Sequence, residues 1–291
     1  MQLKASFKKE LLYFSRSGKL YVILLVPILT MILLTMFYSY ADDIVGVTGM
    51  TINPEKMGIS TEEFGEYEDF DLIKETFSQG SMFTTLSILG TILTIVLSVF
   101  LLMGASGKEQ KEKAHIIPNS AGLKSVNYVS AKFFIYPIFV YIVNFLMTLI
   151  IGIMSMNLFD KAPEGAVIAF NIDMGQILLY AATISLLPLF LVCTSFCIGL
   201  SSGKAGIGAI STILGAYLLN NVFVKMGLYS YYPMAFPNLI SSYLMDNQSV
   251  SIYEIVITII ITLVLCVLAY LISIFFLQSR EIRNYEDIPE F

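Results

Sequence analysis

The sequence predicts an all-α integral membrane protein with six transmembrane helices in a single domain, residues 1–291. The chain is 56% hydrophobic and only 13% charged, with a mean hydropathy of +0.77, which leaves too little polar surface for a soluble domain. Its apolar residues form blocks without charges, each long enough for the roughly 20 helical residues that cross a bilayer. The blocks are residues 20–40, 82–103, 133–156, 177–200, 205–224 and 256–277. The alternating ten-residue segments of an outer-membrane barrel are not visible.

Lys and Arg residues are distributed unevenly between the segments that join these blocks. With the N-terminus in the cytoplasm, the cytoplasmic segments hold thirteen of the seventeen Lys and Arg residues. Basic residues concentrate on the cytoplasmic side of membrane proteins. We therefore expect a multi-pass protein of the cytoplasmic (inner) membrane, embedded in its lipid bilayer with both termini cytoplasmic.

Residues 1–19 have the pattern of an amphipathic helix lying on the inner membrane surface. Apolar side chains recur at spacings of 4, 4 and 3 residues and share one face: Leu3, Phe7, Leu11 and Phe14. Lys9 and Arg16 lie opposite, with Lys4 and Lys8 on the flank. This arrangement predicts an interfacial helix; the alternative is a cytoplasmic tail that only sets topology.

Two external segments have unusual composition. Residues 41–81 hold ten acidic residues against two lysines, without the spacing of a calcium-binding loop. We interpret residues 65–71 as a solvated face and expect the segment to form a small folded cap with a short helix near Asp71–Phe77. Residues 225–251 are too aromatic for a solvated loop. We expect this second segment to re-enter the bilayer edge as broken helices covered by protein.

The polar segment 104–132 separates the second and third blocks and carries five lysines, so it is predicted to be cytoplasmic. Its acidic and basic residues favour a short charged helix that ends at Pro118. Such a helix, held between two spans, is a surface on which a soluble partner could act. The candidate coupling residues are Lys108, Glu109, Lys111, Glu112, Lys113, His115 and Pro118.

Neutral polar residues mark a candidate substrate path. Hydroxyl side chains follow one face of the second block at spacings of 4, 3 and 4: Ser87, Thr91, Thr94 and Ser98. They either line a polar path or allow a neighbouring helix to pack closely. Asn220 and Asn221, near the end of the fifth block, are either caps or hydrogen-bonding groups at the outer end of such a path.

Catalytic and metal-binding chemistry is not expected of this chain. His115 is its single histidine, and the three cysteines lie inside predicted spans, where they behave as small apolar residues. Residues 199–205 depart from a phosphate-binding loop in length and final residue. None of the six blocks contains Asp, Glu, Lys, Arg or His, whereas ion-coupled carriers need such groups at membrane depth. Transport energy would therefore come from another chain.

With its N-terminal amphipathic segment, six spans and charged first cytoplasmic loop, the chain resembles the ABC-2 family of ABC exporter permeases. The residues that carry the resemblance are Glu109, Glu112, Pro118, Ser120 and Lys132. The resemblance implies a coupling helix that docks on a separate ABC ATPase subunit, which would hold the ATP and magnesium. It also implies a second permease copy or paralogue, and a path lined by the first, second and fifth spans.

These observations lead us to expect a permease subunit without enzymatic activity, which exports an apolar or amphipathic solute such as a drug, lipid or peptide. No nucleic-acid partner is expected. The alternative, a non-transporting membrane sensor or anchor, has the same topology. In a third alternative, a membrane enzyme, His115 among lysines would have to supply catalysis, for which it is a poor candidate.

Overall fold

The computed structural model describes residues 2–51, 78–111, 125–161, 170–202, 205–244 and 250–286. Within these ranges every regular element is helical. The helices are α1 (Gln2–Arg16), α2 (Gly18–Thr51), α4 (Gln79–Lys111), α6 (Ser125–Leu158), α7 (Met174–Ile184), α8 (Leu186–Ser202), α9 (Ala205–Lys225), η2 (Tyr229–Tyr231), η3 (Pro233–Ala235), α10 (Phe236–Leu244) and α11 (Ile252–Glu286).

The structure confirms six helical segments that are long and apolar enough to cross a membrane. They are Gly18–Tyr40, Gln79–Leu102, Val129–Leu158, Met174–Ser202, Gly206–Lys225 and Ile252–Phe276. Each overlaps one of the uncharged blocks, because a length of apolar helix is a local property of sequence. The part of the chain that the structure describes is therefore a multi-pass helical bundle suited to a lipid bilayer.

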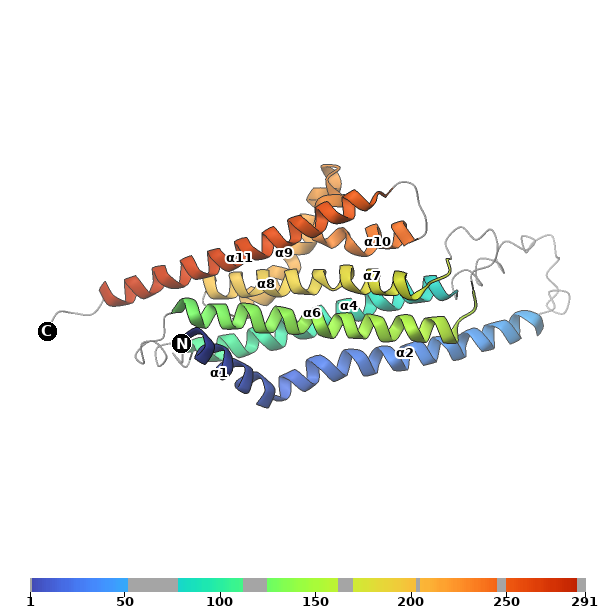
Figure 1. Ribbon diagram of the computed structural model, residues 1–291, viewed down its shortest axis with the longest axis horizontal. Coiled ribbons are helices and arrows are strands. Elements are labelled where there is room, and N and C mark those ends of the chain that lie inside the picture. Colours follow the sequence, from blue (N-terminus) through green and yellow to red (C-terminus); the bar gives the residue numbers. More distant parts are fainter. Residues whose placement is uncertain are drawn as a thin grey trace.

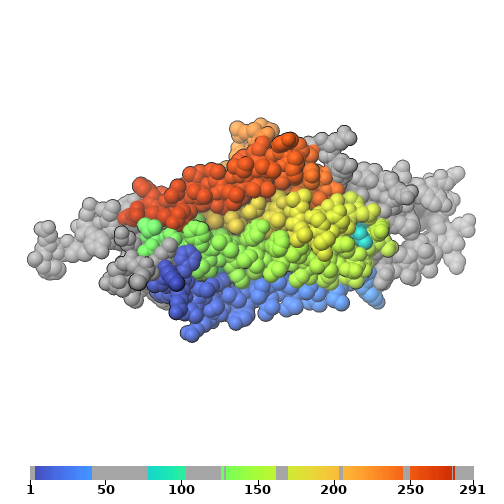
Figure 2. Space-filling model, in the orientation of Figure 1, coloured from blue at the N-terminus to red at the C-terminus, as the bar shows by residue number. Residues whose placement is uncertain are grey.

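The long helices run side by side along the longest axis of the molecule (Figure 1). Helices α1, the start of α2 and the end of α11 lie at one end, which we call the N-terminal end. In the face shown in Figure 2, α2 and α11 form the two edges and α6 and α7 lie between them. The most enclosed span is Met174–Ser202, with 67% of its most apolar window buried, against 22% for the span in α2 and for the span in α11. The core is therefore built around α7 and α8, whereas α2, α9 and α11, each with 22% of that window buried, present apolar surface outward.

The fourth span is interrupted near its middle. Helix α7 ends at Ile184, Ser185 forms a turn, and α8 begins at Leu186. Pro188 has no backbone N–H and cannot bond to the carbonyl of Ile184, so the helical ladder breaks there. The Ser185 backbone N–H and hydroxyl both donate to the Ala181 carbonyl oxygen, at 3.3 and 2.6 Å, so the last turn of α7 stays bonded at the break.

Helices α8 and α9 approach each other closely at one glycine. A Cβ on Gly208 of α9 would lie 2.7 Å from the Gly199 Cα of α8, so only glycine fits there. Gly206 and Gly215 have no such neighbour within 4 Å of a Cβ. The small residues of α9 therefore act at a single crossing point.

Residues 225–244 form broken helices, as expected from their composition. The two short 3-10 helices and α10 pack on α7, α8 and α11, and Ala235, Phe236 and Ile240 are completely buried. The Tyr232 hydroxyl donates to the Ala216 carbonyl oxygen at 3.4 Å. Burial raises the pKa of Tyr232 to about 12, so the phenol stays protonated and able to donate.

The segments that connect the spans are shorter than predicted, because the helices extend beyond the apolar blocks. Helix α2 continues to Thr51, which places the first part of the acidic segment in a helix. Helix α4 continues to Lys111 and α6 begins at Ser125, so Lys108, Glu109 and Lys111 belong to the helix of the second span. The rest of the acidic segment, residues 52–77, and the coupling residues Glu112, Lys113, His115 and Pro118 lie outside the described residues.

Candidate functional site

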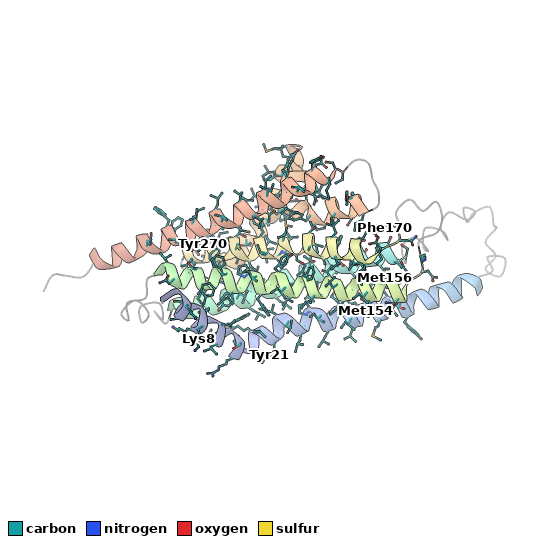
Figure 3. The ribbon with its side chains drawn as sticks, viewed as in Figure 1. Lys8, Tyr21, Met154, Met156, Phe170 and Tyr270 are labelled. Atoms are coloured by element: carbon teal, nitrogen blue, oxygen red, sulfur yellow. The ribbon has the colours of Figure 1, made fainter. Side chains whose placement is uncertain are left out.

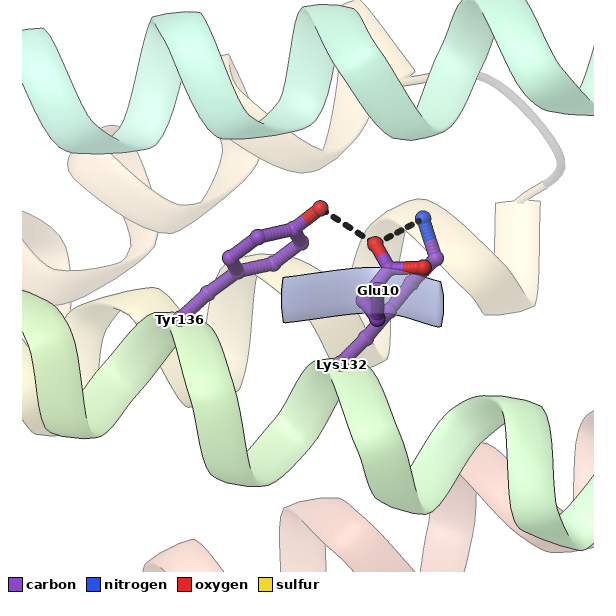
Figure 4. A network of polar contacts seen from close by, with 3 residues as sticks. All are labelled: Glu10, Lys132 and Tyr136. Carbon is purple, nitrogen blue, oxygen red and sulfur yellow. Dashed lines mark hydrogen bonds and ion pairs between the residues drawn. The ribbon is translucent and has the colours of Figure 1, made fainter. Parts of the chain in front are cut away.

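A buried ion pair connects α1 to the beginning of α6 (Figure 4). The Lys132 Nζ lies 3.3 Å from the Glu10 Oε1, and only 3% and 8% of the two side chains are exposed. The Tyr136 hydroxyl donates to the same carboxylate oxygen. Because Lys132 and Tyr136 are four residues apart on α6, both reach the same point on α1.

Aromatic side chains enclose this ion pair. The Phe14 ring meets the Tyr136 ring edge-on at 4.9 Å, and the Tyr136 ring stacks on Phe196 of α8 at 5.5 Å. The Lys132 Nζ also lies 5.6 Å from the centre of the Tyr136 ring. A buried charge is tolerated when it is paired and hydrogen-bonded, and this cluster provides both conditions for Glu10.

Two predictions, the position of Lys132 and the buried face of α1, were wrong in detail. The third span begins at Val129, so Lys132 lies within its first turn rather than in the preceding segment. The face of α1 that packs on the bundle contains Ser6, Glu10 and Phe14, whereas Leu11 is 58% exposed. The predicted apolar stripe is thus divided: Phe14 faces protein and Leu11 faces outward, in the orientation of α1 that brings Glu10 to Lys132.

Sequence reasoning did not identify Glu10 or Tyr136 as site residues. Glu10 is the only acidic residue among residues 1–19, which contain five basic ones. Lys132 is the only charged residue between residues 125 and 158. The sequence did contain a signal for this pair: Glu10 is an isolated acid and Lys132 an isolated base, and each lies next to an apolar span.

A second polar cluster lies halfway along the spans. The Asn144 Nδ2 of α6 donates to the Thr91 hydroxyl of α4 at 3.3 Å and to the Ser185 hydroxyl, at the break between α7 and α8, at 3.1 Å. All three residues are at most 1% exposed. One amide thus joins three spans near the middle of the predicted membrane thickness.

The hydroxyl stripe of the second span belongs to this interior. Ser87, Thr91, Thr94 and Ser98 are all at most 1% exposed. The Thr94 hydroxyl contacts the Met147 Sδ at 3.7 Å, and the hydroxyl oxygens of Ser87 and Ser98 have no hydrogen-bond partner in the described part of the chain. In this conformation the stripe faces the neighbouring spans rather than lipid.

Asn220 and Asn221 do not cap α9, because that helix continues to Lys225. The Asn221 Nδ2 donates to the Tyr217 carbonyl oxygen of the same helix at 3.1 Å, and Asn221 is exposed. The Asn220 Oδ1 is buried without a partner among the described residues. The capping interpretation was therefore wrong.

The remaining candidate chemistry is limited. Cys193 is buried and Cys197 and Cys266 pack against the same apolar cluster, with all three thiols free. Among the described residues, His, Cys, Asp and Glu side chains form no group of three that could hold a metal ion.

Comparison with known proteins found no matching family model, no similar curated protein and no similar solved structure. The site is therefore interpreted from its own geometry.

Proposed function

We propose that this chain is the membrane subunit of an ATP-driven exporter, energised by a separate ATPase subunit and working with a second permease chain. Its cargo would be an apolar or amphipathic solute. The observation that supports this proposal is the distribution of charge along the six spans. Every Asp, Glu, Lys or Arg in them lies within four residues of a span end: Lys19, Lys132, Lys225 and Glu254.

The interior of the bundle offers neutral polar groups instead. Asn144, Thr91 and Ser185 meet near the middle of their spans, where a proton-coupled or ion-coupled carrier would place titratable groups. Hydroxyl and amide groups can bind polar parts of a solute, but they supply no driving force. The energy for transport is therefore assigned to a partner protein.

The ion pair provides a route for that energy. Helix α6 starts directly after residues 112–124, which hold Glu112 and most of the proposed ATPase-binding residues. Lys132 lies two turns into α6 and joins Glu10 of α1, and α1 leads directly into α2. Movement of the segment 112–124 would thus displace α6, α1 and α2 together, shifting the bundle between two conformations. The hydroxyl stripe of α4, with Asn220 and Asn221, would line the path opened by that shift.

The first test is affinity purification of the full-length chain from membranes of its own cells in mild detergent. We expect an ATPase with a phosphate-binding loop to co-purify. The double variant Glu109→Lys/Glu112→Lys should lose that ATPase, while the matched control Glu66→Lys/Glu68→Lys in the acidic segment should keep it. Normal ATPase recovery with the first variant would refute the docking assignment.

The second test is reconstitution of the purified chain in liposomes. Solute transport by the chain alone, without a nucleotide-hydrolysing partner, would contradict the proposal. A complex that contains no ATPase would instead favour the sensor or anchor alternative.

A further inference from the structure

Helix α1 has a buried face and an outer face of different charge. Ser6, Glu10 and Phe14 are buried, and Glu10 and Phe14 contact α6. The four basic residues of α1 are all exposed: Lys4, Lys8, Lys9 and Arg16. Turning Glu10 inward therefore separates the single acidic residue of the segment from its basic residues.

The outer face is consequently a purely cationic surface. Glu10 is already neutralised by Lys132, at 3.3 Å, and residues 1–19 contain no other acid. The sequence alone gives a helix of mixed charge, whereas the fold presents four positive charges outward. Such a surface attracts anionic groups within roughly one Debye length, about 8 Å at physiological salt.

Apolar side chains accompany these charges. Leu12 and Tyr13 on α1 are 46% and 51% exposed. Helix α2 begins two residues after α1 and its first turns expose Tyr21 and Leu25 in the first candidate span. Lys8 and Tyr21 lie along the same outer edge of the N-terminal end in Figure 3. The cationic face is therefore continuous with a surface that lipid tails would cover.

We propose that this outer face of α1 binds the headgroups of anionic phospholipids. Basic residues beside exposed Leu and Tyr, at the border of a lipid-facing span, match the phosphate layer above the acyl chains. The acidic surface of a soluble protein would match the charges but not the apolar residues at the lipid border. The inference does not depend on the proposed transport function.

The test is native mass spectrometry of the full-length protein after exchange into micelles with equimolar phosphatidylglycerol and phosphatidylcholine. We expect preferential retention of phosphatidylglycerol. Each basic residue near an anionic surface strengthens binding by roughly fivefold at low salt. The variant Lys4→Gln/Lys8→Gln/Lys9→Gln/Arg16→Gln should therefore lose the preference.

The control is Lys161→Gln/Lys225→Gln, which neutralises two exposed lysines outside α1 and should retain the preference. A second measurement needs only the wild-type protein: its preference should shrink as the salt concentration rises from about 0.05 to 0.5 M, because the Debye length shortens.

Equal retention of both lipids by the wild-type protein would overturn the proposal. So would an unchanged preference in the quadruple variant, and a preference unaffected by salt. Loss of a co-purifying protein from that variant, without a lipid preference in the wild type, would assign the face to a protein partner instead.

Discussion

The ion pair between Glu10 and Lys132 yields the sharpest stability prediction. Both side chains are at least 90% buried, so replacing one of them leaves the other charge in a medium that cannot solvate it. Breaking a buried pair in this way costs about 3–5 kcal/mol. We expect Glu10→Gln and Lys132→Met each to lower the free energy of unfolding by this amount.

The double variant Glu10→Gln/Lys132→Met should be far less damaging than the sum of the two single changes. With both charges gone, no uncompensated charge remains, and replacement of a buried pair by neutral groups is often close to neutral. Tyr136→Phe removes only the phenol donor to the carboxylate, and we expect it to cost about 1.5–3 kcal/mol.

The assay is equilibrium unfolding of the full-length chain in mixed detergent micelles, followed by circular dichroism, for the wild type and the four variants. Lys225→Met at an exposed position is the control and should change the free energy by less than about 0.5 kcal/mol. The coupling energy of the double-mutant cycle should exceed about 2 kcal/mol. Additive losses in the double variant would refute the buried pairing.

Three further substitutions test the packing of the bundle by the same unfolding measurement. Gly208→Ala places a methyl 2.7 Å from Gly199 and should cost about 1–3 kcal/mol, whereas Gly215→Ala meets nothing within 4 Å; equal losses would contradict the close crossing. Asn144→Leu removes two interhelical hydrogen bonds and should cost about 1 kcal/mol; an unchanged stability would indicate that these bonds contribute nothing. Ile240→Ala empties a completely buried site in α10 and should cost about 2–5 kcal/mol; a smaller loss would contradict firm packing of that segment.

The six spans and the broken helices of residues 225–244 could be predicted from local sequence. A run of some twenty uncharged apolar residues has few alternatives to a membrane-crossing helix, because its backbone groups must bond to one another in hydrocarbon. The span boundaries were less exact: Lys132 was placed outside the third span, which begins at Val129.

The polar clusters could not be predicted in this way. Glu10 and Tyr136 are 126 residues apart, and Asn144 lies 53 residues from Thr91. Which of several hydroxyl-bearing residues meets Asn144 depends on how the helices are rotated and shifted against one another. Periodicity defines a face of a helix, but it does not specify the helix that covers that face.

The sequence by itself determined that this chain is a six-span helical membrane protein with uncharged span interiors, because hydrophobicity and length act locally along the chain. Only the tertiary structure decided that Glu10 turns inward to Lys132, leaving the outer face of α1 entirely basic, and that Asn144 joins three spans near mid-membrane. A buried charge must find its partner wherever the chain supplies one, and for Glu10 that partner lies on another helix, far away in sequence.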